Sequence, residues 1–303
     1  MHSPLLARPA GGWGLRYASH IGFRFGERPL FLELGGGFDA IAQVNFAARL
    51  GFSGVLNPWA RVASRAQNCA FGAAARELGI EASCVMFAGI ETVRSPIWTK
   101  RDRESREALT AHIRAACDVA KLISSRTVAV VATADTKEPL APQRKAMREN
   151  LADASSLAAE CGVTLAVETM LSLPDMLLGN NAQILDLLAD IGSPNVKLIF
   201  DTHHVAAIEG VDAVLESFKS SYAHISVLQL ADYPIKYQPD TGEIAFLPIL
   251  VEAMTRAFDG LVDLEFHWSL PGADGEVAGL KRFVELDSAA RVAAGRSDLI
   301  GVV

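Results

Sequence analysis

The sequence predicts an α/β protein built as a single (β/α)8 barrel, the TIM-barrel fold. It has 303 residues, half of them hydrophobic, which is enough to bury one large core. Eight short hydrophobic, β-branched segments alternate with patterns typical of helices. Several of these segments end in an oxygen-bearing side chain, as the strands of an enzyme barrel do. Residues 1–303 are therefore expected to form one domain, with residues 1–15 as an N-terminal extension.

The predicted elements follow one another along the chain without long linkers. Strands are expected over residues 17–23, 54–57, 82–87, 128–132, 164–168, 197–201, 224–229 and 262–266. Helices are expected over residues 40–50, 64–78, 101–122, 142–161, 181–191, 213–220, 247–258 and 276–293. In the fourth helix, Leu151, Ala154, Leu157 and Ala158 recur at offsets of three and four, as an amphipathic helix requires. This alternation leaves two architectures, a closed barrel or an open doubly wound sheet.

The positions of glycines indicate where the helices end and help to distinguish the closed barrel from the open sheet. Gly51, Gly79, Gly162 and Gly192 each close a helical pattern, where a left-handed cap costs least for glycine. Eight units are the number that closes a barrel, and no glycine-rich phosphate loop follows the first strand. The cluster at residues 35–37 precedes a helix, whose start could bind phosphate. It lacks both common phosphate-loop patterns, so a flexible loop is expected there.

Composition narrows the class of partner. The formal net charge of −7 argues against a nucleic-acid or anionic membrane surface, because binding phosphates requires clustered Lys and Arg. The four cysteines are far apart, without a CxxC pair, so neither a disulfide framework nor a zinc site is indicated. The chain has no uninterrupted apolar run of membrane-spanning length and no signal-peptide pattern. We expect a soluble cytoplasmic protein with a small-molecule partner.

Four oxygen-bearing side chains recur at strand ends in the second half of the chain: Glu168, Asp201, Gln229 and Glu265. They are spaced by roughly 30 residues, about one strand-plus-helix unit. A single polar residue at a strand end more often caps a helix or bridges a loop. Four of them in a parallel barrel converge on one rim, where three carboxylates repel one another unless a cation lies between them. All-oxygen donors suit Mg²⁺ or Mn²⁺ better than zinc.

Several motifs resemble those of hydroxypyruvate isomerases. Residues 229–244, QLADYPIKYQPDTGEI, are similar to the family pattern Q-I-A-D-x-P-G-R-x-E-P-x-x-G-E-I. FDTHH at residues 200–204 is similar to F-D-x-Y-H, and LEF at 264–266 to the final strand. ENL at 149–151 and LAVE at 165–168 match E-N-L and L-x-x-E. The resemblance covers about residues 37 to 270 and implies the xylose-isomerase-like group of barrel sugar isomerases, epimerases and dehydratases.

The resemblance implies roles for particular residues. The ligands of one divalent ion, Mn²⁺ or Mg²⁺, fall on Glu168, Asp201, Gln229 and Glu265. The substrate-contacting histidine falls on His204, three residues after the aspartate, and Lys236 would help to orient the substrate. His203 is the weaker candidate, because side chains alternate along a strand. Barrels of this kind often form homo-oligomers, which is also an expectation for this chain.

The expected chemistry follows from a metal flanked by two glutamates. A divalent ion that holds adjacent carbonyl and hydroxyl oxygens stabilises the enediolate formed when a proton leaves carbon. Glu168 and Glu265, on the fifth and eighth predicted strands, could remove that proton and return it elsewhere. The leading hypothesis is an isomerase or epimerase of a ketose, keto acid or sugar derivative. The alternative is a lyase or dehydratase acting on a glycoside or cyclic polyol, and a non-catalytic sugar-binding barrel is the third reading.

Three departures from the family pattern bear on the substrate. Lys236 stands where the family has arginine, which replaces a two-pronged anion clamp by a point charge. Residues 169–173 read TMLSL where relatives continue Pro-Ile-Asn, and Asn57 stands where relatives commonly have glutamate. A bulkier or less anionic substrate is therefore expected. Candidate pocket residues are Trp59, Phe87, Met170, Tyr233, Tyr237 and Trp268.

Three further polar residues complete the set of candidates. His20 and His267 lie near predicted strand ends and are expected to line the pocket and contact substrate. Glu243 is expected to pin the long loop after the seventh strand.

Overall fold

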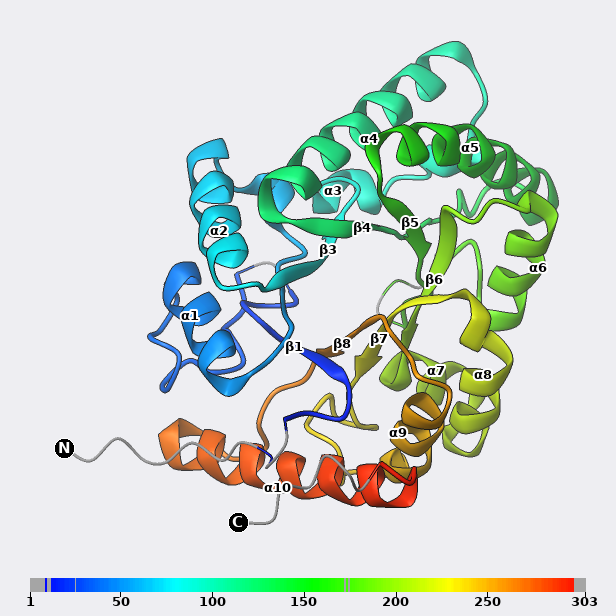
Figure 1. Cartoon of the computed structure of the whole chain (residues 1–303). Helices are drawn as coiled ribbons and strands as arrows, with labels where there is room; N and C mark the ends of the chain where they lie inside the picture. Colours follow the sequence, from blue (N-terminus) through cyan, green and yellow to red (C-terminus); the bar gives the residue numbers. More distant parts are fainter. Residues whose placement is uncertain (1–8, 10–11, 25, 172, 174, 297–303) are drawn as a thin grey trace.

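A closed parallel barrel forms the centre of the molecule (Figure 1). The computed structural model describes residues 9, 12–24, 26–171, 173 and 175–296. The strands are β1 Arg16–His20, β2 Gly54–Leu56, β3 Glu81–Met86, β4 Ser125–Val130, β5 Thr164–Val167, β6 Val196–Asp201, β7 Ile225–Leu230 and β8 Leu261–Leu264. Every strand pairs in parallel with its neighbours in chain order, and β8 pairs with β1. The predicted (β/α)8 fold is confirmed.

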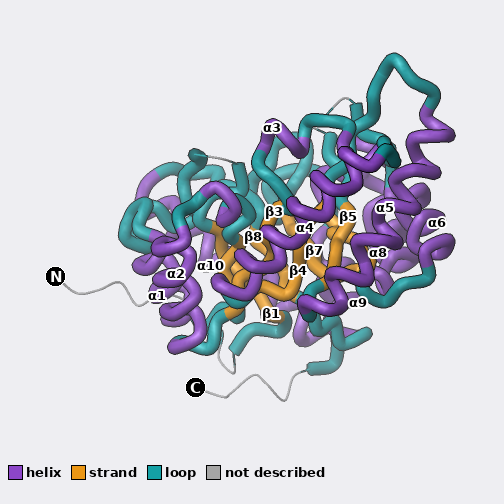
Figure 2. Tube along the Cα trace, turned by 90° about the horizontal axis from the view of Figure 1, so that it is seen from above, coloured by secondary structure: helices purple, strands orange, loops and turns teal. Residues whose placement is uncertain are grey.

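Helices surround the strands on the outside, as Figures 1 and 2 show. They are α1 Ala40–Leu50, α2 Arg65–Glu77, α3 Ile90–Val93, α4 Arg103–Ile123, α5 Leu140–Cys161, α6 Asn181–Ile191, α7 Thr202–Glu209, α8 Val214–Ser221, α9 Phe246–Thr255 and α10 Gly272–Ala293. Short 3-10 turns are η1 Ala60–Val62, η2 Ile97–Thr99, η3 Val211–Ala213 and η4 Tyr222–His224. All eight predicted helices are present, while α3 and α7 were not predicted.

Two of the predicted strands are shorter than expected at the end that carries an acid. Glu168 and Glu265 lie just beyond β5 and β8. Their backbone N–H groups still continue the barrel hydrogen bonding, donating to Val130 O at 3.0 Å and Leu230 O at 3.1 Å. Each glutamate is therefore held in strand-like register at the carboxyl end of the barrel.

The predicted glycine caps are largely confirmed. Gly51, Gly162 and Gly192 cap α1, α5 and α6 with φ of 74°, 72° and 63°, in the left-handed region. Gly79 lies one residue beyond the cap of α2, with φ of 67°. At each position a side chain would strain the backbone.

The glycine cluster at residues 35–37 is a hydrogen-bonded turn rather than a phosphate loop. Gln43 Nε2 donates to Phe31 O and Gly37 O, both at 2.8 Å. The start of α1 has its own cap, because Asp39 Oδ1 accepts the N–H groups of Ile41 and Ala42. A carboxylate already bound to these N–H groups disfavours an anion at the same place.

Most of the expected N-terminal extension, residues 1–8, 10 and 11, lies outside the described residues. Of the remainder, Trp13 packs its ring 5.3 Å from that of Tyr17, and Gly14 N–H donates to Asp287 Oδ1 at 3.1 Å. Asp287, on α10, also accepts the Tyr17 hydroxyl at 2.9 Å. Burial raises the pKa of Asp287 to about 6 despite these bonds. The last helix is thereby tied to the first strand.

All four cysteines are free. Among the described residues, no helix combines the length and apolar character needed to cross a membrane.

Candidate functional site

A cavity of about 450 Å³ opens at the carboxyl ends of the strands. Its walls come from strand ends and from the loops that follow them, the position where barrel enzymes place their sites. The polar side chains that line it on the β5 to β8 side are Glu168, His203, His204, Gln229, Lys236 and Glu265. Three of the four predicted metal ligands are among them, and the fourth, Asp201, lies directly against Lys236.

The amide of Gln229, on β7, joins the two glutamates. One of its terminal atoms lies 3.1 Å from Glu265 Oε2 and 3.2 Å from Glu168 Oε1. With the NH₂ group at that place, the amide donates to both carboxylates. With the oxygen there, three oxygens converge without a donor between them, which is the donor set that a hard cation takes. The geometry accommodates both orientations of the amide.

Lys236 connects the remaining two carboxylates. Its Nζ atom lies 2.8 Å from Asp201 Oδ2 and 2.9 Å from Glu265 Oε2, and 5.0 Å from the centre of the Phe23 ring. The ammonium and both carboxylates are almost fully buried. Burial acts to lower the pKa of Lys236, but the two carboxylates outweigh it and raise the pKa above its usual value.

Asp201, at the end of β6, also caps the helix that follows. Its Oδ1 atom accepts the N–H groups of His203 at 2.7 Å and His204 at 3.2 Å, so it is the N-cap of α7. Burial would raise its pKa, yet Lys236 and His204 hold it below the usual range. The aspartate therefore remains ionised at neutral pH and fixes the helix that presents the histidines.

The two histidines both line the cavity. The reason for ranking His203 as the weaker candidate does not hold, because residues 202–209 form α7 and strand alternation does not apply there. His203 Nδ1 lies 2.7 Å from Asp232 O and donates to it. His204 Nδ1 accepts the Leu171 N–H at 3.3 Å, which leaves Nε2 with the proton, 3.5 Å from Asp201 Oδ2. Burial lowers the pKa of His204 to about 4, so its ring is neutral at pH 7.

Burial dominates the acidity of the two glutamates. It raises the pKa of Glu168 to about 8, with repulsion from Asp201 acting in the same direction and Lys236 opposing it. It also raises the pKa of Glu265 well above the usual value, although Lys236 again opposes the shift. Near neutral pH and without a further positive charge, the Glu168 carboxyl therefore holds its proton.

Asp263 is a buried acid that the sequence reasoning did not single out. It lies in β8, paired in register with Gln229, and its Oδ2 atom accepts the Ser83 hydroxyl at 2.8 Å. Burial raises its pKa to about 7, opposed by hydrogen bonds from Ser83 and Gln229. The sequence could have indicated Asp263, since residues 263 and 265 lie on the same side of a strand and Glu265 was already a candidate. Asp263 places a carboxyl inside the barrel beneath the cavity.

The other two predicted histidines have structural partners. His20 is fully buried: its Nε2–H donates to Phe266 O at 2.9 Å, and its Nδ1 accepts the Gly22 N–H at 3.1 Å. His267 Nε2 lies 2.7 Å from Glu27 Oε1. Neither is among the described residues that line the cavity. The expectation that His20 and His267 line the pocket and contact substrate is therefore corrected. A contact with substrate would require each ring to give up the hydrogen bonds described here.

The loop after β7 is pinned by Asp232 rather than by Glu243. The Asp232 carboxylate accepts the N–H groups of Tyr233, Thr241, Gly242 and Ile244 at 2.7–3.1 Å. A Cβ on Gly242 would collide with the Tyr233 carbonyl and the Asp232 carboxylate, so glycine is required there. The Glu243 side chain is exposed, which corrects the expectation for it. This loop places Lys236 over the site.

Only part of the predicted pocket lining is correct. Trp59 and Met170 line the cavity. Phe87 and Trp268 belong to the core, where they pack against Trp98 and Phe31. Tyr233 and Tyr237 are absent from the described residues around the cavity.

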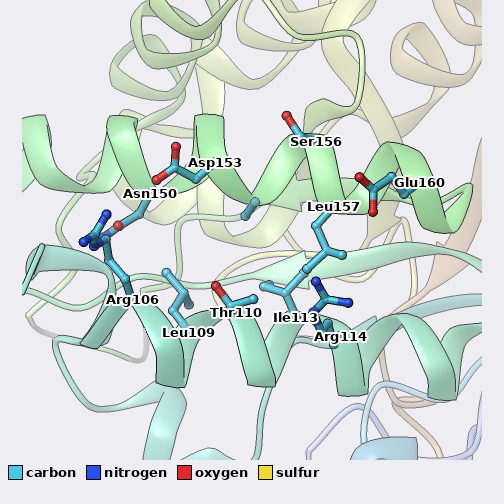
Figure 3. Close-up of a pocket in the computed structure, with 11 residues that line it drawn as sticks. Arg106, Leu109, Thr110, Ile113, Arg114, Asn150, Asp153, Ser156, Leu157 and Glu160 are labelled. Carbon is cyan, nitrogen blue, oxygen red and sulfur yellow. The ribbon is translucent and has the colours of Figure 1, made fainter. Parts of the chain in front are cut away.

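A second hollow, of about 250 Å³, lies between α4 and α5 on the outside of the barrel (Figure 3). Leu109, Ile113 and Leu157 face one another across it, while charged side chains from both helices border it. Asp153 at its edge is already paired with Arg101 at 2.7 Å. Because no set of ligands converges there, the cavity at the barrel rim is the candidate active site.

The closed parallel barrel and the acidic, amide and histidine side chains at its carboxyl rim define a barrel of the enzyme type. A family model described as "Xylose isomerase-like TIM barrel" matches residues 44–285, and the chain belongs to this family.

Two relatives found by sequence comparison are isomerases, in agreement with the sequence motifs. The chain is 33% identical over 122 residues to 2-oxo-tetronate isomerase of Cupriavidus necator and 27% identical over 121 residues to hydroxypyruvate isomerase of Escherichia coli. Each match covers 39% of this chain and 46% of the relative, so the chain aligns with just under half the length of these relatives. The resemblance to hydroxypyruvate isomerases is confirmed.

The fold is also similar to that of a solved structure, 3-keto-D-glucoside 4-epimerase from E. coli. The TM-score is 0.70 at 16% identity, with 90% of this chain and 99% of that chain covered. A likeness at this identity establishes the fold alone.

Proposed function

We propose that the protein is a divalent-metal-dependent isomerase or epimerase of a ketose, keto acid or sugar derivative, acting through an enediolate. The main support is the meeting of Glu168, Gln229, Glu265 and Asp201 at the rim of the barrel. They are joined by contacts of 2.8–3.2 Å through the Gln229 amide and the Lys236 ammonium. The names of the two relatives, both isomerases, agree with this reaction class.

The residues present fit one divalent ion. Glu168, Asp201 and His204 can each offer a ligand atom within 4.8 Å of the others, and Gln229 can turn its oxygen toward both glutamates. We assign Glu168, Asp201, Gln229 and Glu265 as ligands, a hard oxygen set that favours Mn²⁺ or Mg²⁺. When bound, such an ion supplies Lewis-acid polarisation of adjacent substrate oxygens.

The two glutamates are the proposed acid and base. They approach the Gln229 amide from β5 and β8, so the reacting carbon can lie between them. The ionised carboxylate of one removes the proton next to the carbonyl, and the other returns a proton to the neighbouring carbon or to the opposite face. A raised pKa, about 8 for Glu168, makes a carboxylate a stronger base once it is ionised.

His204 and Lys236 are proposed to orient the substrate. The Nε2–H of His204 is a donor facing the carboxylates, since Nδ1 is occupied by Leu171. Lys236 offers ammonium protons at the opposite side, beside Glu265. Both would bind substrate oxygens and favour the negative charge that develops there.

A lyase or dehydratase is the second candidate, because the same enediolate can expel a neighbouring leaving group. The size of the cavity favours this reading, since about 450 Å³ exceeds the needs of a three-carbon acid and suits a glycoside or cyclic polyol. One protein of similar fold is named for a keto-glucoside, but it is an epimerase, so its name bears on the size of the substrate and not on the lyase reaction. A non-catalytic sugar-binding barrel is less well supported, since all four ligand positions are filled by suitable residues.

Proton NMR in D₂O with Mg²⁺, across a panel of ketoses and 2-oxo acids, tests the proposal. Deuterium entering the carbon next to the carbonyl supports the enediolate, while release of a substituent indicates the lyase. Glu265→Gln should lower exchange by about 10²–10⁴-fold, with Mn²⁺ binding followed separately by calorimetry. Full exchange in a Glu265→Gln protein that still binds the ion would refute the two-glutamate arrangement.

A cytoplasmic location and a homo-oligomer remain predictions from the sequence. Light scattering of the purified protein tests the second.

A further inference from the structure

We infer that the substrate of this site has an aromatic substituent, bound in a separate apolar part of the cavity. The inference rests on the proposed function, because it assigns the second half of the same cavity. The ketone end would lie against the acidic half, on β5 to β8. The substituent would lie against the half formed by the loops after β2, β3 and β5.

The two halves differ in chemistry. The apolar part is formed mainly by Trp59, Met86, Ile90, Val93, Met170 and Leu171. Trp59 follows β2, Met86 ends β3, Ile90 and Val93 belong to α3, and the other two follow Glu168 in the loop after β5. Charged groups in this part are Arg24 and Arg94, both exposed and therefore at the mouth.

Such a wall does not suit a polyhydroxylated chain. A hydroxyl group moved from water to a surface of carbon and sulfur loses its hydrogen bonds without replacement, which costs free energy. A ring of carbon atoms gains from the same transfer. Leu171 is half exposed beside the catalytic half of the cavity, and a bound apolar group would cover it.

The kinds of side chain favour an aromatic ring in particular. The Trp59 Nε1–H donates to Phe23 O at 3.0 Å, so this indole is held in one orientation at the cavity wall. Met86 and Met170 add thioethers, which make favourable contacts with aromatic rings. A fixed indole and two sulfur atoms form a surface that suits stacking and edge contacts.

A pair of substrates that differ only in the substituent tests the inference. Methyl and phenyl 3-keto-β-D-glucopyranoside both present a ketone beside a carbon bearing hydroxyl and hydrogen. Deuterium exchange at that carbon is followed in D₂O with Mg²⁺, alongside unsubstituted ketoses and 2-oxo acids. We expect kcat/KM to be at least about tenfold higher for the phenyl compound, the usual gain from filling an apolar pocket.

Two variants link this preference to the apolar half. Leu171→Ser and Ile90→Ser should each bring the phenyl-to-methyl ratio of kcat/KM close to one. The hydrogen bond from Leu171 to His204 comes from the backbone N–H, so the change of side chain leaves that donor in place. Leu140→Ser is the control, since Leu140 is similarly exposed but begins α5, outside the cavity. It should leave the ratio unchanged.

The outcomes separate the two proposals. Exchange with equal kcat/KM for both glycosides, or a phenyl preference that survives both serine variants, overturns the assignment of the apolar half and leaves the proposed function standing. Exchange with none of the ketones or keto acids overturns the proposed function. Calorimetry then still tests recognition: tighter binding of phenyl than of methyl glucoside supports an aromatic site, and equal binding refutes it.

Discussion

Replacing Lys236 by methionine tests the electrostatic centre of the site. The ammonium lies 2.8 Å from Asp201 and 2.9 Å from Glu265, with all three groups almost fully buried. At an effective dielectric constant of about 20, each contact is worth roughly 6 kcal/mol before desolvation. Most of this is offset by removing the charges from water. Loss of one partner from a buried ion pair costs about 3–5 kcal/mol, because the other charge stays buried and unpaired.

We therefore expect Lys236→Met to lower the free energy of unfolding by about 3–5 kcal/mol at pH 7 in EDTA. Urea unfolding followed by circular dichroism measures it. Methionine keeps the length of the aliphatic stem, so the loss reports mainly the charge. The loss should be smaller at pH 5, where the carboxyls can take up protons. Lys219→Met is the control, because Lys219 pairs with Glu216 at 2.7 Å on the exposed surface, and no measurable loss is expected.

The same pair of proteins also tests the metal proposal. Saturating Mn²⁺ supplies positive charge to the unpaired carboxylates and should restore much of the stability that Lys236→Met loses. A variant as stable as wild type in EDTA would refute the buried ion pair. A variant that is destabilised but gains no stability from Mn²⁺ would agree with the buried ion pair and contradict the assignment of Asp201 and Glu265 as ligands.

Two further predictions concern pH and the loop above the site. Burial raises the pKa of Glu168 from 4.5 to about 8, so its contribution to stability is complete below about pH 4.5 and is lost as pH rises through 8. Urea midpoints in EDTA at pH 5, 6.5 and 8 should therefore fall more steeply for wild type than for Glu168→Gln; parallel curves would contradict the shift. Asp232→Ala removes the acceptor of four backbone N–H groups and should cost about 3 kcal/mol. It should also raise KM by loosening Lys236, and an unchanged urea midpoint would show that the loop does not depend on this carboxylate.

The barrel was predictable because its signals are local. Alternation of strand and helix patterns gave all eight strands, and glycine gave several helix ends. Helix α7 was not predicted because Asp201 is both the last residue of β6 and the N-cap of α7. No loop separates the two elements, so no change of sequence pattern marks the start of the helix. α3 has only four residues, too few for a helical period.

The sequence predicts which side chains reach the candidate site, because each of them lies at or directly after the end of a strand. It predicts less well the role of a side chain that depends on which distant group it hydrogen-bonds or pairs with. Glu168, Asp201, Gln229 and Glu265 meet as their spacing implied. Sequence position could not show that the nitrogens of His20 are both taken by backbone groups, one of them 246 residues away. Nor could it show that the charge of Lys236 is shared by two carboxylates from different strands.

The ionisation of the site links ligand binding to catalysis. The charges of Asp201 and Lys236 offset each other, while Glu168 holds its proton near neutral pH because burial raises its pKa to about 8, and burial also raises the pKa of Glu265. On the proposed function, the two glutamates must ionise to hold a divalent ion, so binding releases protons and tightens as pH rises toward 8. The same ionisation makes one glutamate available as the base. A single buried pair of carboxyls therefore couples metal loading to the readiness of the site for proton transfer.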